Sequence, residues 1–431
     1  MQLIRRLMIS WVMIFSSVFL VFAQSPAKAN PCETGDRTAS GLSNQVVAGN
    51  TAFALDLYAQ LKTAENGNLF YSPYSISTAL AMTHVGAKRK TATQMSEVLH
   101  FPKCQIALHP AFSRLQNQIN EAAQKNIKLS IANALWGQTE YGFRQDFTDA
   151  VYEYYKAPLK EVDFTTKYQT IHQVINAWVA DKTNGKIKDM VPKGVLTDLT
   201  RLVLVNAIYF KGSWKSPFQT SNTTTQPFSL TSRHSIQVPM MTQKNYFRYQ
   251  EFENLQVLEL PYIQNRQENS LEFPFSYDEN TVSMIVLLPR QPDGLAELES
   301  SLNPTNLDQW LDDLRWQKVK VFLPKFKINT GFELSNTLKK MGMSDAFNDD
   351  ADFSGMTDKE KLYIMSIIHK AFVEVNEKGT EAAATTAVFF ATKGLSPPTP
   401  TFRADHPFIF LIRHNLSGSI LFMGRIQNPL K

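Results

Sequence analysis

The chain lacks the sequence patterns that mark the common enzyme classes. Its 431 residues contain only two cysteines and eight histidines, and neither C-x-x-C nor H-E-x-x-H occurs, so zinc chemistry has no support. The motifs G-x-S-x-G, G-x-x-x-x-G-K-S/T and G-x-G-x-x-G are also absent, which removes the usual support for α/β-hydrolase, phosphoryl-transfer and nicotinamide chemistry. His369 lies in an apolar run, which is more typical of a hydrogen-bonded core histidine than of a catalytic base.

A strong excess of charge of one sign is missing too. The chain has 44 basic and 39 acidic residues and a formal net charge of +5. Three of these positive charges, Arg5, Arg6 and Lys28, precede residue 30, and no acid does, so the rest carries a net charge of +2. This balance offers no electrostatic basis for nucleic-acid binding, and no nucleic-acid partner is expected.

The one long apolar run without charge is at the N-terminus. Arg5 and Arg6 precede the run Leu7–Ala23, and Ala27 and Ala29 supply a small-x-small cleavage pattern, which together are typical of a secretory signal peptide. We expect removal of residues 1–29, with cleavage after Ala23 as the alternative. An uncleaved anchor is the other interpretation, since about 17 apolar residues are at the lower edge of a membrane-spanning length. The mature protein should therefore be secreted, extracellular or periplasmic, with no membrane contact.

The composition of the mature chain predicts a short N-terminal tether followed by one domain. Residues 30–43 are polar and contain Pro31, Gly35 and Gly41, and no later composition shift divides residues 44–431. Cys32 in the tether and Cys104 in the domain could form a disulfide in an oxidising compartment, and two free thiols are the alternative.

Periodicity changes from helical to strand-like near residue 200. Helices are predicted from about Asn44, where Phe53, Leu57 and Leu61 repeat at helical spacing, and over an apolar stripe that ends at Asn184-Gly185. That stripe consists of Ile171, Val174, Ile175, Trp178 and Val179. Strands are predicted over 202–210, 255–260, 282–288, 318–323, 362–375, 408–412 and 419–423. Helices in one half and strands in the other predict an α+β fold rather than a doubly wound parallel sheet.

A connection of about 25 residues between two predicted strands is long for a compact domain, and such loops tend to be functional or disordered. It covers residues 377–402 and is rich in alanine and threonine. After Gly379, the alternate residues Thr380, Ala382, Ala384 and Thr386 are small, uncharged and free of proline, as a strand with one buried face requires. A plain linker is the competing interpretation.

Seven stretches of the sequence form one ordered set of motifs. They are Asn68–Ser75, Asn133–Trp136, Asn206–Trp214, Leu323–Phe326, Val375–Ala384, Ala404–Phe408 and Ser419–Arg425. In their order and spacing the sequence resembles the serpin family from about Asn44 to the C-terminus. The stretch Val375–Ala384 matches the hinge of the family's inhibitory members.

The resemblance implies three β-sheets, about nine helices and an exposed reactive-centre loop that inserts into the central sheet after cleavage. In the family's scheme a serine protease attacks the loop, forms an acyl-enzyme, and is trapped when the freed loop becomes a strand. Counting from Glu377, as the family does, places the cleaved bond at Lys393-Gly394, which suits a trypsin-like pocket. Counting back from the downstream end selects Gly394, and a shifted register with Thr392 or Ala391 would favour an elastase-like target.

The resemblance also assigns supporting residues. The hinge residues are Glu377, Gly379, Thr380, Ala382, Ala383 and Ala384; the shutter residues, beneath the point where the sheet parts, are Ser72, Ser75, Asn206 and His369; and the breach residues, where insertion starts, are Trp214, Lys325 and Glu377. The plain alternative is that these side chains only satisfy buried polar groups.

The expected partner is a serine protease, and the inhibitor is expected to act as a monomer. A non-inhibitory serpin that binds or carries a ligand is the second hypothesis, but the hinge lacks the charged, bulky or proline residues typical of such members. A secreted hydrolase on an unrecognised scaffold is the third. No cofactor is expected: a glycosaminoglycan would need a basic helical face, and residues 105–128 offer only Arg114, Lys125 and Lys128.

Overall fold

The structure is a computed structural model that describes residues 39–102, 105–122, 127–263, 282–359, 361–380 and 398–431. Several predictions from the sequence therefore lie outside the described residues. These are the signal peptide, the Cys32–Cys104 disulfide, the hinge residues Ala382, Ala383 and Ala384, and the bond Lys393-Gly394.

The described residues form nine α-helices. They are α1 Ala39–Ala64, α2 Pro73–His84, α3 Arg89–Val98, α4 Gln105–Ala122, α5 Gln145–Tyr155, α6 Phe164–Lys182, α7 Leu295–Ser301, α8 Pro304–Asp312 and α9 Ser335–Met341. Helix α1 begins at Ala39, so the last five residues of the expected 30–43 tether are helical. None of the helices in this part of the chain combines the length and apolar content that crossing a bilayer requires.

Two helix boundaries follow from local chemistry. Helix α2 starts with Pro73 behind Ser72, whose side chain accepts a hydrogen bond from the Ser75 N–H, a favourable N-cap. Helix α6 ends at Lys182, just before Asn184 and Gly185, which both have positive φ. Its predicted apolar stripe was wrong at Val174, which is 49% exposed.

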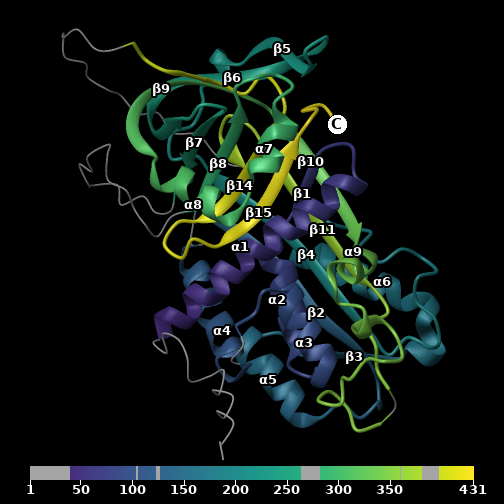
Figure 1. Ribbon diagram of the computed structural model, residues 1–431. Helices are drawn as coiled ribbons and strands as arrows, with labels where there is room; N and C mark the ends of the chain where they lie inside the picture. The colour runs from purple at the N-terminus through teal and green to yellow at the C-terminus, as the bar shows by residue number, and fades with distance from the viewer. Residues whose placement is uncertain (1–38, 103–104, 123–126, 264–281, 360, 381–397) are drawn as a thin grey trace, which may run out of the picture. The chain divides into compact units, whose positions relative to one another are not determined.

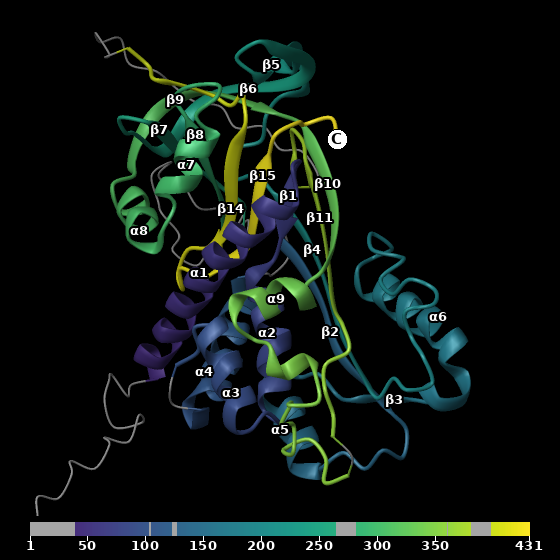
Figure 2. The same cartoon turned by 45° about the vertical axis from the view of Figure 1, so that its right-hand side comes forward.

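A six-stranded sheet lies between α6 and the other N-terminal helices (Figure 2). Its strand order is β10-β11-β4-β2-β3, with β12 also paired to β4. The strands are β2 Ile127–Gln138, β3 Lys160–Val162, β4 Leu202–Ser213, β10 Phe326–Glu333, β11 Ile367–Val375 and β12 Gly379–Thr380. The prediction that the strand before the loop starts at Leu362 was wrong by five residues, since Leu362 is buried in the core but precedes β11.

The second hydrogen-bonded sheet has nine strands, in the order β1-β15-β14-β8-β7-β6-β9-β13, with β5 paired to β6. They are β1 Leu69–Tyr71, β5 Thr224–Thr231, β6 His234–Glu251, β7 Leu255–Pro261, β8 Val282–Pro289, β9 Arg315–Pro324, β13 Thr401–Arg403, β14 Phe408–His414 and β15 Ile420–Ile426. The long strand β6 pairs with β5 and β9 along most of its length and with β7 at its end. Hence two of the three sheets implied by the resemblance are continuous here. The helices and mixed sheets confirm the α+β class.

The two faces of β4 pack against different layers because side chains alternate along a strand. Leu204 and Ile208 belong to the main core, which includes α2, whereas Val203 and Val205 pack in a second cluster with α6. Every side chain that enters the sheet beside β4 must therefore fit one of these two layers.

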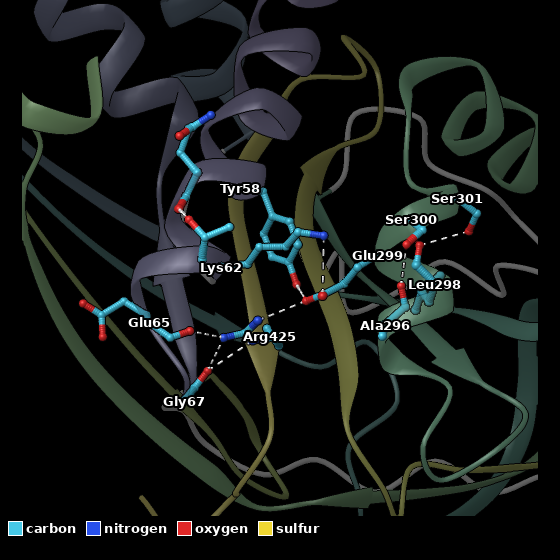
Figure 3. A network of polar contacts seen from close by, with 12 residues as sticks. Tyr58, Lys62, Glu65, Gly67, Ala296, Leu298, Glu299, Ser300, Ser301 and Arg425 are labelled. Atoms are coloured by element: carbon cyan, nitrogen blue, oxygen red, sulfur yellow. Dashed lines mark hydrogen bonds and ion pairs between the residues drawn. The ribbon is translucent and has the colours of Figure 1, made fainter. Parts of the chain in front are cut away.

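A buried polar network ties α1 and α7 to β15 (Figure 3). The Arg425 guanidinium, 3% exposed, donates to Glu299 Oε1 at 3.0 Å and to the Gly67 carbonyl at 2.8 Å. Tyr58 donates to the same carboxylate oxygen at 2.7 Å, and Lys62 lies 3.6 Å from the other. The network joins three separate chain segments by polar contacts in addition to the apolar core that they share.

We expect Arg425→Ala to lower the free energy of unfolding by about 3–5 kcal/mol, because it leaves the Glu299 carboxylate buried without its guanidinium partner. Lys62→Ala is the matched control: its side chain is 25% exposed, and loss of such a pair should cost less than about 1 kcal/mol. Urea unfolding followed by tryptophan fluorescence measures both. Equal destabilisation by the two variants would contradict this ranking.

Candidate functional site

One edge of β4 is shared by two partners. Strand β11 pairs with it in parallel, from Ile367 opposite Leu204 to Phe372 opposite Tyr209. Above that point β12 pairs with it in antiparallel fashion, with Gly379 opposite Ser213 and Thr380 opposite Gly212. Gly379 and Thr380 therefore already form a short strand on the same edge of β4, beyond the end of its pairing with β11.

A tight turn returns the chain from β11 to β12. The Asn376 N–H donates to the Gly379 carbonyl at 2.9 Å, and the Gly379 N–H donates to the Asn376 carbonyl at 3.2 Å. Gly379 has a φ of +140°, and a Cβ at this position would lie 2.1 Å from the Gly212 carbonyl oxygen. Only glycine satisfies both the backbone conformation and this close approach.

Thr380 and Trp214 fasten this turn to the core. Thr380 is 1% exposed, and its hydroxyl lies 3.0 Å from the hydroxyl of Tyr262. Tyr262 stacks on Trp214 with ring centroids 4.6 Å apart, and the Trp214 indole N–H donates to the Asn376 carbonyl at 3.0 Å. Trp214, predicted as a breach residue, thus contacts the hinge turn.

Lys325 and Glu377, both predicted as breach residues, form an ion pair in the structure. Lys325 Nζ lies 2.9 Å from Glu377 Oε2 and 3.1 Å from Oε1, and Thr223 donates to Oε1 at 2.9 Å. Burial by itself would raise the pKa of Glu377, but hydrogen bonds from Lys325, its own backbone N–H and Thr223 outweigh it and hold that pKa below its usual range. The carboxylate is therefore charged and fully engaged at neutral pH.

The four predicted shutter residues lie together in the middle of the sheet. Asn206 Nδ2 donates to the Ser75 hydroxyl oxygen at 2.7 Å and to Asn133 Oδ1 at 2.6 Å. The Ser72 N–H donates to His369 Nε2 at 3.1 Å, and the Ser72 hydroxyl caps α2. His369, Asn206 and Asn133 are directly opposite one another on β11, β4 and β2. Their side chains form one row across three strands, here called the polar row.

The hydrogen bonds of His369 define its tautomer. Its Nε2 accepts from the Ser72 N–H, so Nδ1 carries the proton and donates to Asn206 Oδ1. Burial lowers the pKa of His369 to about 3. The ring is therefore neutral at physiological pH and links β11 to β4, the two strands that a new strand would have to separate.

Sequence reasoning missed three residues of this site. Asn133 was part of a recognised stretch, but only the strand register places it beside Asn206. Thr223 bonds Glu377 and Tyr262 bonds Thr380, and both contacts join segments more than 100 residues apart. No local pattern in the sequence indicates them.

Comparison with known proteins gives one consistent family. A profile described as "Serpin (serine protease inhibitor)" matches residues 48–429. The leukocyte elastase inhibitor of Homo sapiens is 41% identical, with 89% of this chain and all of that protein covered. Antithrombin-III of Mus musculus is 39% identical, with 88% and 81% covered. The structure of uncleaved ovalbumin superposes with a TM-score of 0.78 at 32% identity, over 89% of this chain and 100% of that one.

The matched range includes both the β4 edge with its hinge turn and the polar row beneath it. The matching profile is described as a serine protease inhibitor, and one of these relatives is named an elastase inhibitor. The chain belongs to the serpin family of serine protease inhibitors.

Proposed function

We propose that this chain is a secreted, monomeric inhibitor of trypsin-like serine proteases that acts as a suicide substrate, with Lys393-Gly394 as the cleaved bond. Secretion is supported by the N-terminal residues, in which Arg5 and Arg6 precede the apolar run Leu7–Ala23. The observation that carries the mechanism is the pairing of Gly379 and Thr380 with β4.

That pairing defines the path of an inserted loop. If the loop continues the register of β12, each further residue comes opposite the preceding residue of β4. Ala382 then comes opposite Phe210 and Ala384 opposite Ile208, which both belong to the main core. Because paired residues point to the same face, these loop positions need small side chains, and alanine meets that need.

The length of β4 suits the length of the loop. The strand has 12 residues, so in this register the segment from Gly379 to Phe390 would fill its whole edge, and Lys393 would come just beyond it. About a dozen new backbone hydrogen bonds at about 1 kcal/mol each, with packing added, could supply on the order of 10–20 kcal/mol. That is enough to distort a protease stable by about 5–15 kcal/mol.

Insertion has a barrier because the loop and β11 compete for the same edge of β4. A loop that passes Thr386 opposite Asn206 must displace His369 from that position and break its hydrogen bond. The native state is therefore metastable, and the polar row is the barrier that the mechanism has to cross.

The side chain of Lys393 supports a trypsin-like target, since a lysine suits a primary pocket with an acidic base. An elastase is the second candidate, because a relative 41% identical to this chain is named leukocyte elastase inhibitor. It would correspond to cleavage after Thr392 or Ala391, in the shifted register.

We expect trypsin to form a complex with this protein that survives SDS, and the released C-terminal peptide to begin at Gly394. Mass spectrometry of that peptide identifies the bond. Lys393→Ala is the control and should abolish trypsin capture by more than a hundredfold, since the pocket's carboxylate then has no cation to bind. A peptide that begins at Thr392 or Lys393, with elastase captured instead, would assign the shifted register.

A further inference from the structure

Strands β6, β9 and β13 present one face with four cations. Lys244 on β6 lies directly opposite Lys320 on β9, and Lys318 is two residues before Lys320. Arg403 on β13 is opposite Phe322, two residues after Lys320. These four residues, here called the basic face, point to the same side because their positions alternate in register. The three lysines are exposed.

The arrangement of the basic face costs stability. Like charges directly opposite one another in an antiparallel pair are destabilising, yet Lys244 and Lys320 occupy such positions. In the part of the chain that the structure describes, no carboxylate lies within 4.0 Å of Lys244, Lys318 or Lys320, and Arg403 has Asp405 at 3.9 Å. With a net charge of only +2 after residue 30, this local excess is not a consequence of overall composition.

Aromatic rings lie against three of these four cations. Lys318 Nζ lies 5.9 Å from the centroid of Tyr246, and Lys320 Nζ lies 5.0 Å from that of Phe322. Arg403 stacks on the same Phe322 ring at 3.6 Å. Such cation–π contacts contribute about 0.5–1 kcal/mol each at exposed sites, which favours positions of Lys318, Lys320 and Arg403 against the rings.

The basic face adjoins the end of the reactive-centre loop. Strand β13 is the first strand after that loop, and Lys320 N–H donates to the Pro400 carbonyl at 2.9 Å. The chain segment that leads into β13 runs beside β6 and β9 in Figures 1 and 2. From Lys393 to Thr401 the chain can reach at most about 27 Å. A protease of about 220 residues has a radius of gyration near 17 Å, so one docked at Lys393 is large enough to rest on this face.

We propose that the basic face is a docking surface for an acidic patch beside the active site of the target protease. The proposal rests on the proposed inhibitory function. Oppositely charged surfaces raise the association rate and have less effect on later steps. The face therefore selects among proteases of equal primary specificity by their surface charge, before loop cleavage and insertion.

The test compares Lys244→Gln/Lys320→Gln with the native protein, using an anionic and a cationic trypsin. For the anionic trypsin at low salt, we expect the second-order rate constant of inhibition to fall about tenfold or more. The loss should disappear near 1 M salt, where the screening length is about 3 Å. Inhibition of the cationic trypsin should not slow. Because the double variant removes a repulsion, its urea midpoint should be unchanged or higher, which separates the effect from misfolding.

Lys339→Gln/Lys340→Gln is the control, since it removes the same charge from α9, which lies away from β9 in Figure 1. Equal slowing by this control would overturn the docking surface, as would an unchanged rate for the basic-face variant with SDS-stable complexes still formed. Loss of heparin binding with unchanged rates would assign the face to an anionic polysaccharide and overturn the proposal as well. Failure of the native protein to form any complex would instead refute the proposed function.

Discussion

Thr380→Arg is expected to convert the inhibitor into a substrate. Thr380 already pairs with β4 in the uncleaved chain, where it is 1% exposed and faces the main core opposite Gly212. An arginine at this position should release the two-residue strand β12 from the edge of β4, and loop insertion would then have to bury the guanidinium in that layer. Burial of an unpaired charge costs several kcal/mol, and each 1.4 kcal/mol slows a step tenfold. Insertion should thus become at least about a hundredfold slower relative to deacylation. Trypsin would then cleave the loop and escape.

The measurement is the ratio of SDS-stable complex to cleaved inhibitor, together with the moles of inhibitor needed to block one mole of enzyme. Thr380→Ser is the conservative control, because it keeps the hydroxyl that contacts Tyr262. Glu381→Arg carries the same guanidinium on the opposite face of the strand and should inhibit nearly normally. Stoichiometric inhibition by Thr380→Arg would rule out insertion beside β4 in the register of β12.

Glu377→Lys should open the top of the sheet prematurely and cause loop–sheet polymerisation on mild heating. The variant loses the contacts with Lys325 and Thr223 and places two ammonium groups together. Breaking a fully buried pair costs about 3–5 kcal/mol, and since Lys325 is 37% exposed, about 2 kcal/mol is expected here. That corresponds to roughly thirtyfold faster opening. Native gels after incubation at increasing temperatures should show ladders at lower temperatures than for the unaltered protein.

Two controls separate the effect of losing the Lys325–Glu377 ion pair from the effect of changing the net charge. Glu374→Lys makes the same change of charge on the neighbouring strand β11, where Glu374 lies opposite Lys327, and should polymerise little. Glu377→Gln keeps an acceptor for Thr223 and should be intermediate. If Glu377→Lys stays monomeric up to the same temperature as the native protein, the Lys325–Glu377 pair does not keep the top of the sheet closed.

The sequence was informative where short-range constraints operate. The alternate small residues that begin at Thr380 predicted a segment able to form a strand with one buried face, and Thr380, the member of that set that the structure describes, pairs with β4. The helical stripe of α6 was correct at Ile171, Ile175 and Val179, which are buried, but not at Val174. A strand was expected from Leu362, whose apolar character reflects burial in the core rather than pairing in a sheet.

Long-range pairing could not be predicted from residue patterns. The position of Asn133 in the row with Asn206 and His369 depends on the register of three strands, and the bond from Thr223 to Glu377 depends on how two distant segments meet. The continuity of the larger sheet likewise depends on the partners that β6 finds at each end.

The sequence by itself determined the family, the α+β class and the chemistry of the hinge, because backbone conformation, side-chain size and alternation are properties of neighbouring residues. Only the tertiary structure decided which edge of β4 receives the hinge, which strand competes for that edge, and that lysines from β6 and β9 face one another. These arrangements depend on contacts between segments far apart in the chain, where packing of the whole core selects one register among several that the local sequence allows.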